Sequence, residues 1–360
     1  MKLFHLPYIV QKLVLDHMPL NNIFFLSLCS KNTKNVIKQI QKNQFEKTEF
    51  KHVNCIISVT VMSISVGTCN ALMFLFKAPI YFINEIAQCE EGDAVEEVQV
   101  NELGTSIDFF RSPVNQTGLH AKYTSDNAES VIESIHNHFC DLLGRDPEVR
   151  LLTGWRDAQV LPLLRNIHKL DIYGGDDSAL TRINEIFSKS SCLEVFSWFG
   201  EHQDDVTFEE CSKVYEMDTL VVCRSRLLEM DVLKFFKGRR AFLCCTSITT
   251  PDVIQFLNEW RSGEKFQNLE VIDISSPQQI PDIRRSVELK ELNTSVEYSY
   301  IKKSESSTTH DKFESRLYMV RESDDRVASV RLEHERVIMG VWNMTEAEFL
   351  QKFQIIDSIE

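Results

Sequence analysis

Signature motifs of the common enzyme classes are absent from this sequence. It has no glycine-rich phosphate loop, no Gly-x-Ser-x-Gly nucleophile elbow and no His-Glu-x-x-His zinc motif. These motifs supply the phosphate cradle, the exposed nucleophile and the paired metal ligands on which those classes depend. We therefore predict a protein that is not an enzyme, and we expect no cofactor and no metal ion.

Glycine and proline are also scarce, with 12 and 9 residues in 360, whereas 43% of the residues are hydrophobic. Fibrous and low-complexity chains have the opposite composition, so the sequence indicates ordered globular structure. Basic residues are outnumbered as well, and the formal net charge is -14. A negative field repels nucleic acid backbones and anionic membranes, so we expect no nucleic-acid partner and interpret the basic cluster at 237–240 as a solvated turn.

None of the ten cysteines forms a Cys-x-x-Cys pair. Cys244 and Cys245 lie next to each other in an apolar run, as is typical of buried free thiols in a reducing compartment. The apolar N-terminal run is interrupted by Pro7, Lys12 and Asp16, which is unlike a secretory signal. We expect a cytoplasmic or nuclear location, or both.

The uncharged stretch at 53–76 is long enough to span a bilayer. Its apolar residues alternate with Ser and Thr, shift phase at Met62, alternate again, and reach turn residues at 67–70. Alternation is typical of a strand, and a phase shift indicates a bulge. We therefore predict a buried hairpin in this region and no membrane partner.

Short apolar strands recur from residue 166 onward, at intervals of about 20 to 29 residues, which is the period of leucine-rich repeats. Helical patterns separate them at 178–189, 230–238 and 249–263, and a further helix is predicted over 127–144. Strands that alternate with helices predict right-handed crossovers and a parallel sheet. The strand centres are Leu170, Val195, Val221, Phe242 and Val271.

The helix predicted over 249–263 has the clearest boundaries, because Thr250 can cap it, Pro251 suits its first position and Gly263 can end it. After it the pattern changes. Residues 314–342 form three strand-like runs, separated by turn residues at 322–325 and 334–336. Such runs predict an antiparallel meander.

Two groups of residues could ligate a metal. His136 and Cys140 are four residues apart on the predicted helix, but two ligands need partners from elsewhere. Asp171, Asp176 and Asp177 surround a strand end and could hold a divalent cation. The simpler interpretation of these aspartates is a solvated turn. The simpler interpretation of the first group is a histidine that lies at the surface or has its hydrogen bonds satisfied within the protein.

The segment from residue 5 to residue 31 carries more apolar residues than a short helical hairpin can bury. Val10, Val14 and Met18 share one helical face, whereas Leu6, Ile9, Leu13 and Leu15 lie on the others. Something else must cover them.

Residues 6–37, LPYIVQKLVLDHMPLNNIFFLSLCSKNTKNVI, resemble an F-box. A Leu-Pro pair opens a helix, a second proline follows about a dozen residues later, and a Leu-Ser-Leu-Cys-Ser-Lys run stands where the family has its similar segment. The resemblance implies a Skp adaptor as partner and, through it, a cullin. The implied adaptor contacts are Leu6, Pro7, Ile9, Val10, Leu13, Met18, Pro19, Leu20, Leu26, Leu28 and Ser30.

Residues 248–274 and 324–342 resemble segments of the nematode type 2 F-box-associated family. This second resemblance implies the substrate receptor of a Skp/cullin/F-box ubiquitin ligase, with an unknown protein substrate. The expected fold class is α/β: a three-helix F-box at 1–45, a strand-rich connecting region with one helix at 46–160, and a substrate-recognition domain at 161–360. That domain combines the degenerate leucine-rich-repeat-like region with the C-terminal antiparallel meander.

Polar and aromatic residues directly after the repeat strands are the predicted substrate surface, because such segments emerge on one edge of a solenoid. They are Tyr173, Asp176, Asp177, Trp198, Arg224 and Arg226. A tryptophan at a strand end is otherwise usually a core residue. Two alternatives stay open at this point: an α/β enzyme with accessory helices, and a repeat-type binding module that acts outside any ligase.

Overall fold

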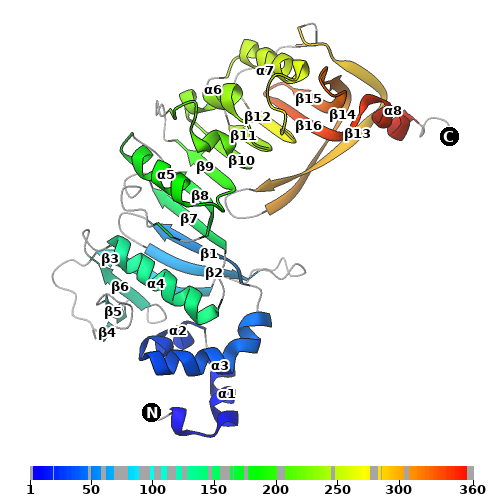
Figure 1. Ribbon diagram of the computed structural model, residues 1–360. Helices are drawn as coiled ribbons and strands as arrows, with labels where there is room; N and C mark the ends of the chain where they lie inside the picture. The colour runs from blue at the N-terminus through cyan, green and yellow to red at the C-terminus, as the bar shows by residue number, and fades with distance from the viewer. Residues whose placement is uncertain are drawn as a thin grey trace. The chain divides into compact units, whose positions relative to one another are not determined.

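The computed structural model divides the chain into two compact units. The N-terminal unit comprises Met1–Leu170 and Lys189–Cys192, and the C-terminal unit comprises Asp171–Ser188 and Leu193–Glu360. The division falls within strand β8 (Ile167–Tyr173) (Figure 1). The structure describes residues 3–18, 20–47, 50–57, 62–68, 80–88, 98–100, 107–111, 119–123, 128–144, 148–154, 163–164, 166–173, 177–200, 207–244, 248–275, 283–284, 286–303 and 308–354.

The N-terminal unit begins with helices and continues with strands. Its helices are η1 (Leu3–His5), α1 (Tyr8–His17), α2 (Leu20–Leu28), α3 (Lys31–Lys47) and α4 (Ala128–Leu143). Its strands are β1 (Phe50–Ile57), β2 (Met62–Thr68), β3 (Ile80–Gln88), β4 (Val98–Val100), β5 (Ile107–Arg111), β6 (Leu119–Tyr123) and β7 (Glu148–Gly154). They lie in the order β7-β1-β2-β3-β6-β5-β4, with β1/β7 and β3/β6 parallel. The predicted helix over 127–144 is α4, which ends at Gly144 with φ 69°.

The predicted hairpin corresponds to three successive strands. β1 and β2 pair antiparallel, as do β2 and β3, so antiparallel pairing of this apolar region is confirmed. The expected irregularity after Met62 is confirmed, because the register of β2 against β3 shifts between Met62 and Ile64. A single strand running through Met62 is wrong, because Met62 begins β2. Residues 58–61 and 69–79 lie outside the described part of the chain. Among the helices that the structure describes, none has the length and apolar character needed to cross a membrane.

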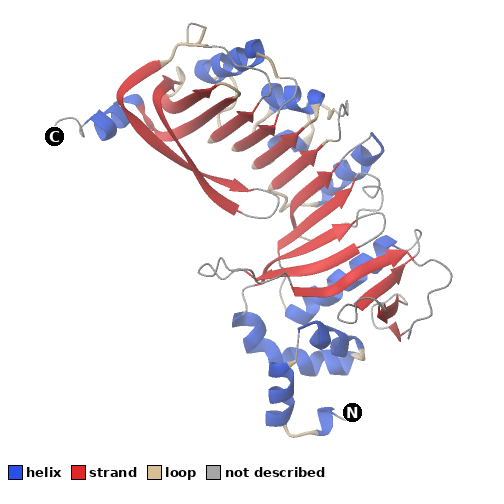
Figure 2. Cartoon of the chain, turned by 180° about the vertical axis from the view of Figure 1, so that it is seen from behind, coloured by secondary structure: helices blue, strands red, loops and turns tan. Residues whose placement is uncertain are grey.

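The C-terminal unit contains four parallel strands in the order β9-β10-β11-β12. The predicted parallel sheet is thus confirmed, and each predicted strand centre lies within a strand. The strands are β9 (Val195–Phe199), β10 (Thr219–Cys223), β11 (Arg240–Cys244) and β12 (Val271–Ser275). The intervening helices are α5 (Asp177–Lys189), η3 (Lys213–Glu216), α6 (Arg226–Phe235) and α7 (Thr250–Ser262), with the α-helices on one face of the sheet (Figure 2).

Helix α7 follows its predicted boundaries with one correction. The cap is Thr249 rather than Thr250, and the Asp252 carboxylate accepts a hydrogen bond from the Thr249 N–H at 2.9 Å. Gly263 ends the helix at φ 78°, a left-handed conformation that glycine adopts without steric cost. Helix α6 begins at Arg226, before the predicted 230–238 segment.

The predicted repeat character of this region is not confirmed. A true repeat uses the same supersecondary unit each time. In the described residues, the connection from β9 to β10 carries only the short 3-10 helix η3, whereas those from β10 to β11 and from β11 to β12 carry α6 and α7.

The C-terminal meander is confirmed. It contains β14 (Thr308–Val320), β15 (Arg326–Glu333) and β16 (Arg336–Thr345), which pair antiparallel and turn at the predicted places. A further strand, β13 (Lys290–Lys303), pairs with β14, and helix α8 (Glu346–Gln354) follows the meander. β16 also pairs antiparallel with β12, so the meander extends the parallel sheet.

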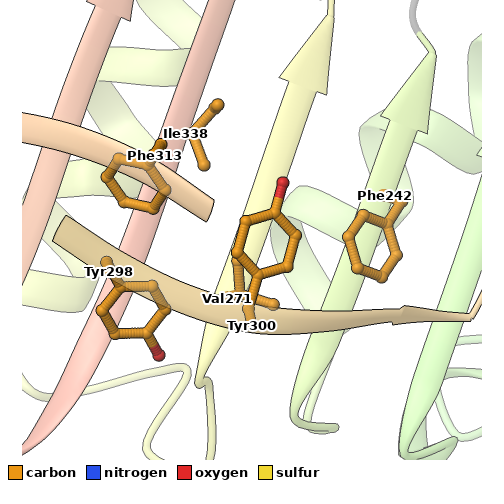
Figure 3. Close-up of a cluster of buried hydrophobic side chains, with 6 residues drawn as sticks. All are labelled: Phe242, Val271, Tyr298, Tyr300, Phe313 and Ile338. Carbon is orange, nitrogen blue, oxygen red and sulfur yellow. The ribbon is translucent and has the colours of Figure 1, made fainter. Parts of the chain in front are cut away.

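Strands β13 and β14 cross the sheet face that the helices leave free. Tyr298, Tyr300 and Phe313 on this ribbon form one buried cluster with three sheet residues, Phe242, Val271 and Ile338 (Figure 3). The Tyr298 ring lies so close to Gly340 that a Cβ there would come within 2.4 Å of it. Glycine is therefore required at this crossing.

Candidate functional site

Helices α2 and α3 pack on α4 of the same unit. The Phe24 ring of α2 lies 6.3 Å from that of Phe139, and the Ser27 hydroxyl lies 2.8 Å from Nε2 of His138. The ammonium groups of Lys34 and Lys38 on α3 lie 2.5 and 2.6 Å from the Asp141 carboxylate. Both helices therefore have a partner within the chain, α2 through aromatic packing and α3 through ion pairs.

Titratable groups at this contact have displaced pKa values. Burial, together with the nearby charges of Lys34 and Lys38, lowers the pKa of His138 to about 4, so the imidazole is neutral at physiological pH. Hydrogen bonds from the same two lysines lower the pKa of Asp141 to about 2. The contact thus consists of aromatic packing and a neutral histidine, bordered by a persistent ionic cluster.

Helix α1 differs, because most of its apolar side chains face solvent. Leu15 is the one buried residue of the helix. Ile9 is 78% exposed, Leu13 58% and Tyr8 57%, while Leu6 and Val10 are each 39% exposed. We call these five residues the α1 surface. Only one other large hydrophobic residue in the described structure, Ile301, is exposed.

The predicted adaptor contacts fall into four groups. Leu6, Pro7, Ile9, Val10 and Leu13 are exposed together on and just before α1, and Met18 and Leu26 are half-buried. Pro19 and the side chain of Leu20 lie outside the described residues. Two predicted contacts have structural roles within the helices instead. These are Leu28, which is 3% exposed, and Ser30, whose hydroxyl accepts the Thr33 N–H at 3.1 Å at the start of α3.

Sequence reasoning missed Tyr8 as part of this surface. It lies in the apolar run that follows Pro7, and its 57% exposure could have been inferred from the same excess of apolar residues that drew attention to its neighbours. A tyrosine presents a large apolar ring at a small cost in conformational entropy, which favours it in protein interfaces.

Comparison with known families identifies this segment. An F-box domain is found at residues 3–45. F-box domains bind Skp adaptors, and proteins that carry them are typically non-enzymatic, so the match suggests an adaptor or substrate-receptor role in a ubiquitin ligase. No curated protein and no solved structure matches the chain.

The residues predicted to bind substrate do not all reach the surface. Tyr173 is half-buried and stacks on Phe199 at 4.8 Å, whereas Arg224 and Arg226 are exposed directly after β10. Trp198 is fully buried and packs against Phe208 in the core, so its expected place in a binding surface is wrong. Asp176 and the side chain of Asp177 lie outside the described residues.

The candidate metal ligands show no assembled centre. Nε2 of His136 lies 3.4 Å from Sγ of Cys140, and the two side chains contact each other. Within the described part of the chain, no group of three or more His, Cys, Asp or Glu residues could hold a metal ion. Cys244 is free but exposed, contrary to the expected burial, and Cys245 lies outside the described residues.

Proposed function

We propose that this protein is the substrate-recognition subunit of a Skp/cullin/F-box ubiquitin ligase. The observation that carries the proposal is the α1 surface: a contiguous group of exposed apolar side chains, all within the residues that match the F-box domain. Exposed apolar groups of this kind are typical of protein interfaces.

Packing within the N-terminal unit supports this assignment. α2 packs on α4, and the Gln41 amide of α3 donates to the Asp16 carboxylate of α1 at 3.1 Å, while the apolar side chains of the α1 surface remain exposed. An adaptor that covers the α1 surface would form an interface with an apolar core, of the kind found in permanent complexes.

The remainder of the chain, in this proposal, presents an unknown protein substrate to the ligase and performs no chemistry of its own. Its C-terminal unit would correspond to the F-box-associated domain of the nematode type that residues 248–274 and 324–342 resemble. The protein would act in the cytoplasm, the nucleus or both, because exposed thiols such as Cys211 and Cys244 are compatible with a reducing environment.

A titration of purified Skp adaptor tests the proposal. Replacing Ile9 and Leu13 together by Ser removes two exposed apolar side chains without adding charge. Because burying each is worth about 1.5 to 3 kcal/mol, the double variant should bind the adaptor about a hundredfold or more weakly. A matched control, Asn35→Ser with Gln39→Ser, changes two exposed polar residues of α3 and should bind like the wild type.

The result also separates the proposal from its alternative. If the wild type does not bind the adaptor, the chain is a protein-binding module that acts outside this ligase. If the Ile9 and Leu13 variant binds as well as the control, the α1 surface is not the docking site.

A further inference from the structure

Strand β13 is an edge of its sheet. Among the described strands it pairs with β14 alone, although it is 14 residues long. Between residues 297 and 301 the side chains alternate: Tyr298 and Tyr300 are buried, whereas Glu297, Ser299 and Ile301 are exposed. Long edge strands expose main-chain groups that can pair with another chain, and proteins usually shorten or cover them.

A cavity of about 1040 Å³ borders this edge. Residues 297–301 form one wall, and the opposite wall consists of the segments where β10, β11 and β12 begin, at 218, 238–240 and 267–271. Figure 3 shows the strand that carries Tyr298 and Tyr300 nearer to these starting ends than the strand that carries Phe313. The cavity therefore lies beside the edge of β13 that β14 does not occupy.

The charged groups of this cavity are largely paired with one another. The Arg239 Nε–H donates to the Glu270 carboxylate at 2.8 Å, and the Arg240 guanidinium donates to Asp218 at 2.6 Å. Lys237 lies 3.9 Å from Glu216. A charged side chain entering the cavity would have to compete with one of these pairs, whereas an uncharged one would not.

Two features of the walls accept uncharged groups. Ser299 is exposed in the cavity lining, and its hydroxyl can donate to a carbonyl oxygen. Ile301 is 37% exposed and offers an apolar contact in the same lining. An extended polypeptide supplies carbonyl oxygens along its main chain and apolar side chains at every second residue.

We infer that the free edge of β13 binds an extended, uncharged segment of a partner protein as an added strand, with alternate side chains in the cavity. If the protein is a ligase subunit, this partner is the substrate, and that identification rests on the proposed function. The strand pairing itself does not require the adaptor, so the strand-addition proposal and the ligase proposal can be contradicted independently.

The test uses the full chain, with no adaptor present, and a phage-displayed library of random twelve-residue peptides. Selection should enrich peptides that alternate apolar and uncharged polar residues. One enriched peptide is then synthesised with N-methyl groups on either its odd or its even amides. Only every second amide of an added strand faces the edge, so one series should lose binding and the other should keep it.

Two variants of β13 locate the peptide. Ser299→Arg places a large charge in the cavity and should weaken binding of the enriched peptide by about tenfold or more, equivalent to about 1.4 kcal/mol. Ser295→Arg makes the same change at an exposed position of the same strand outside the cavity wall, and should bind within about twofold of the wild type. Melting temperatures of both variants establish that each is folded.

Three outcomes would overturn the inference. The first is equal binding of the two N-methylated series, and the second is enrichment of charged peptides only. The third is a wild-type dimer in sedimentation that Ser299→Arg converts to a monomer while no peptide is enriched, because a second copy of the chain would then occupy the edge. Adaptor titration of the same samples reports on the ligase proposal independently.

Discussion

Helices α1 and α4 belong to the same unit, but α4 buries its apolar side chains and α1 exposes most of them. On α4, Ile135, Phe139 and Leu142 are all at most 3% exposed. On α1, only Leu15 is buried, while Ile9 and Leu13 are more than half exposed. The difference shows that an apolar stripe on a helix predicts a surface that packs against something. It does not predict whether that surface packs within the same chain or against a partner protein.

The first prediction compares a buried and an exposed leucine of α1, one that packs within the chain and one that is proposed to bind the adaptor. Leu15→Ala removes a fully buried side chain and should lower the free energy of unfolding by about 2 to 5 kcal/mol. Leu13→Ala removes a largely exposed one and should change stability by less than about 0.5 kcal/mol. Chemical denaturation monitored by circular dichroism measures both.

Adaptor binding should reverse this order. Folded Leu15→Ala, examined below its melting temperature, should keep most of its affinity, whereas Leu13→Ala should lose about tenfold or more because about 1.5 to 3 kcal/mol of apolar burial is removed. If both leucines affect stability alike, the exposed and buried faces of α1 are not distinct, and the comparison with α4 fails.

Local patterns of the sequence were sufficient for much of the fold. The parallel strands followed from short apolar runs between helical segments, and Gly263 ended α7 because a left-handed residue stops a helix. The F-box was identifiable because its order of prolines and leucines lies in one continuous segment, which the match at residues 3–45 confirms.

Contacts between distant segments were not accessible in this way. The hydrogen bond between Ser27 and His138 joins residues 111 positions apart, and no local sequence pattern predicts it. Leu28 is buried for the same kind of reason: the helices assemble around it. Strand β13 was missed, and its edge and cavity depend on how the ribbon crosses the sheet, where Tyr298 packs over Gly340.

A second prediction concerns the covered side of the F-box helices. The pKa of His138 is about 4 in the folded protein, below the ordinary value of about 6.5, because the site is buried and faces Lys34 and Lys38. The unfolded chain therefore binds the proton more readily, and stability is present above pH 6.5 and declines as the pH falls toward 4. Asp141, with a pKa of about 2, remains ionised throughout this window.

Replacing His138 by Gln should remove this dependence while keeping an amide near Ser27. Between pH 7 and pH 5, the wild type should lose about 1 to 2 kcal/mol more stability than His138→Gln. Urea denaturation at both pH values gives the difference. Parallel pH profiles for the two proteins would mean that His138 is accessible to protons in the folded state, and the α2 contact with α4 would then be looser than the structure shows.

The smallest effect is expected from Lys12, which lies among the apolar residues of the α1 surface. Its ammonium group contacts Asp16 at 2.7 Å, with the two side chains 48% and 33% exposed. Exposed pairs of this spacing contribute about 0.3 to 0.5 kcal/mol, and an order with the lysine first is the less favourable one along a helix. Lys12→Ala should therefore change stability by less than about 0.5 kcal/mol.

If the α1 surface binds through apolar burial, the same variant should bind the adaptor within about twofold of the wild type. Wild-type affinity should also change little between 50 and 500 mM salt, values chosen to span about a threefold range of screening length. A steep loss of affinity with salt, or a loss with Lys12→Ala as large as that with Leu13→Ala, would assign the docking to charge and remove the reason for the exposed leucine and isoleucine side chains.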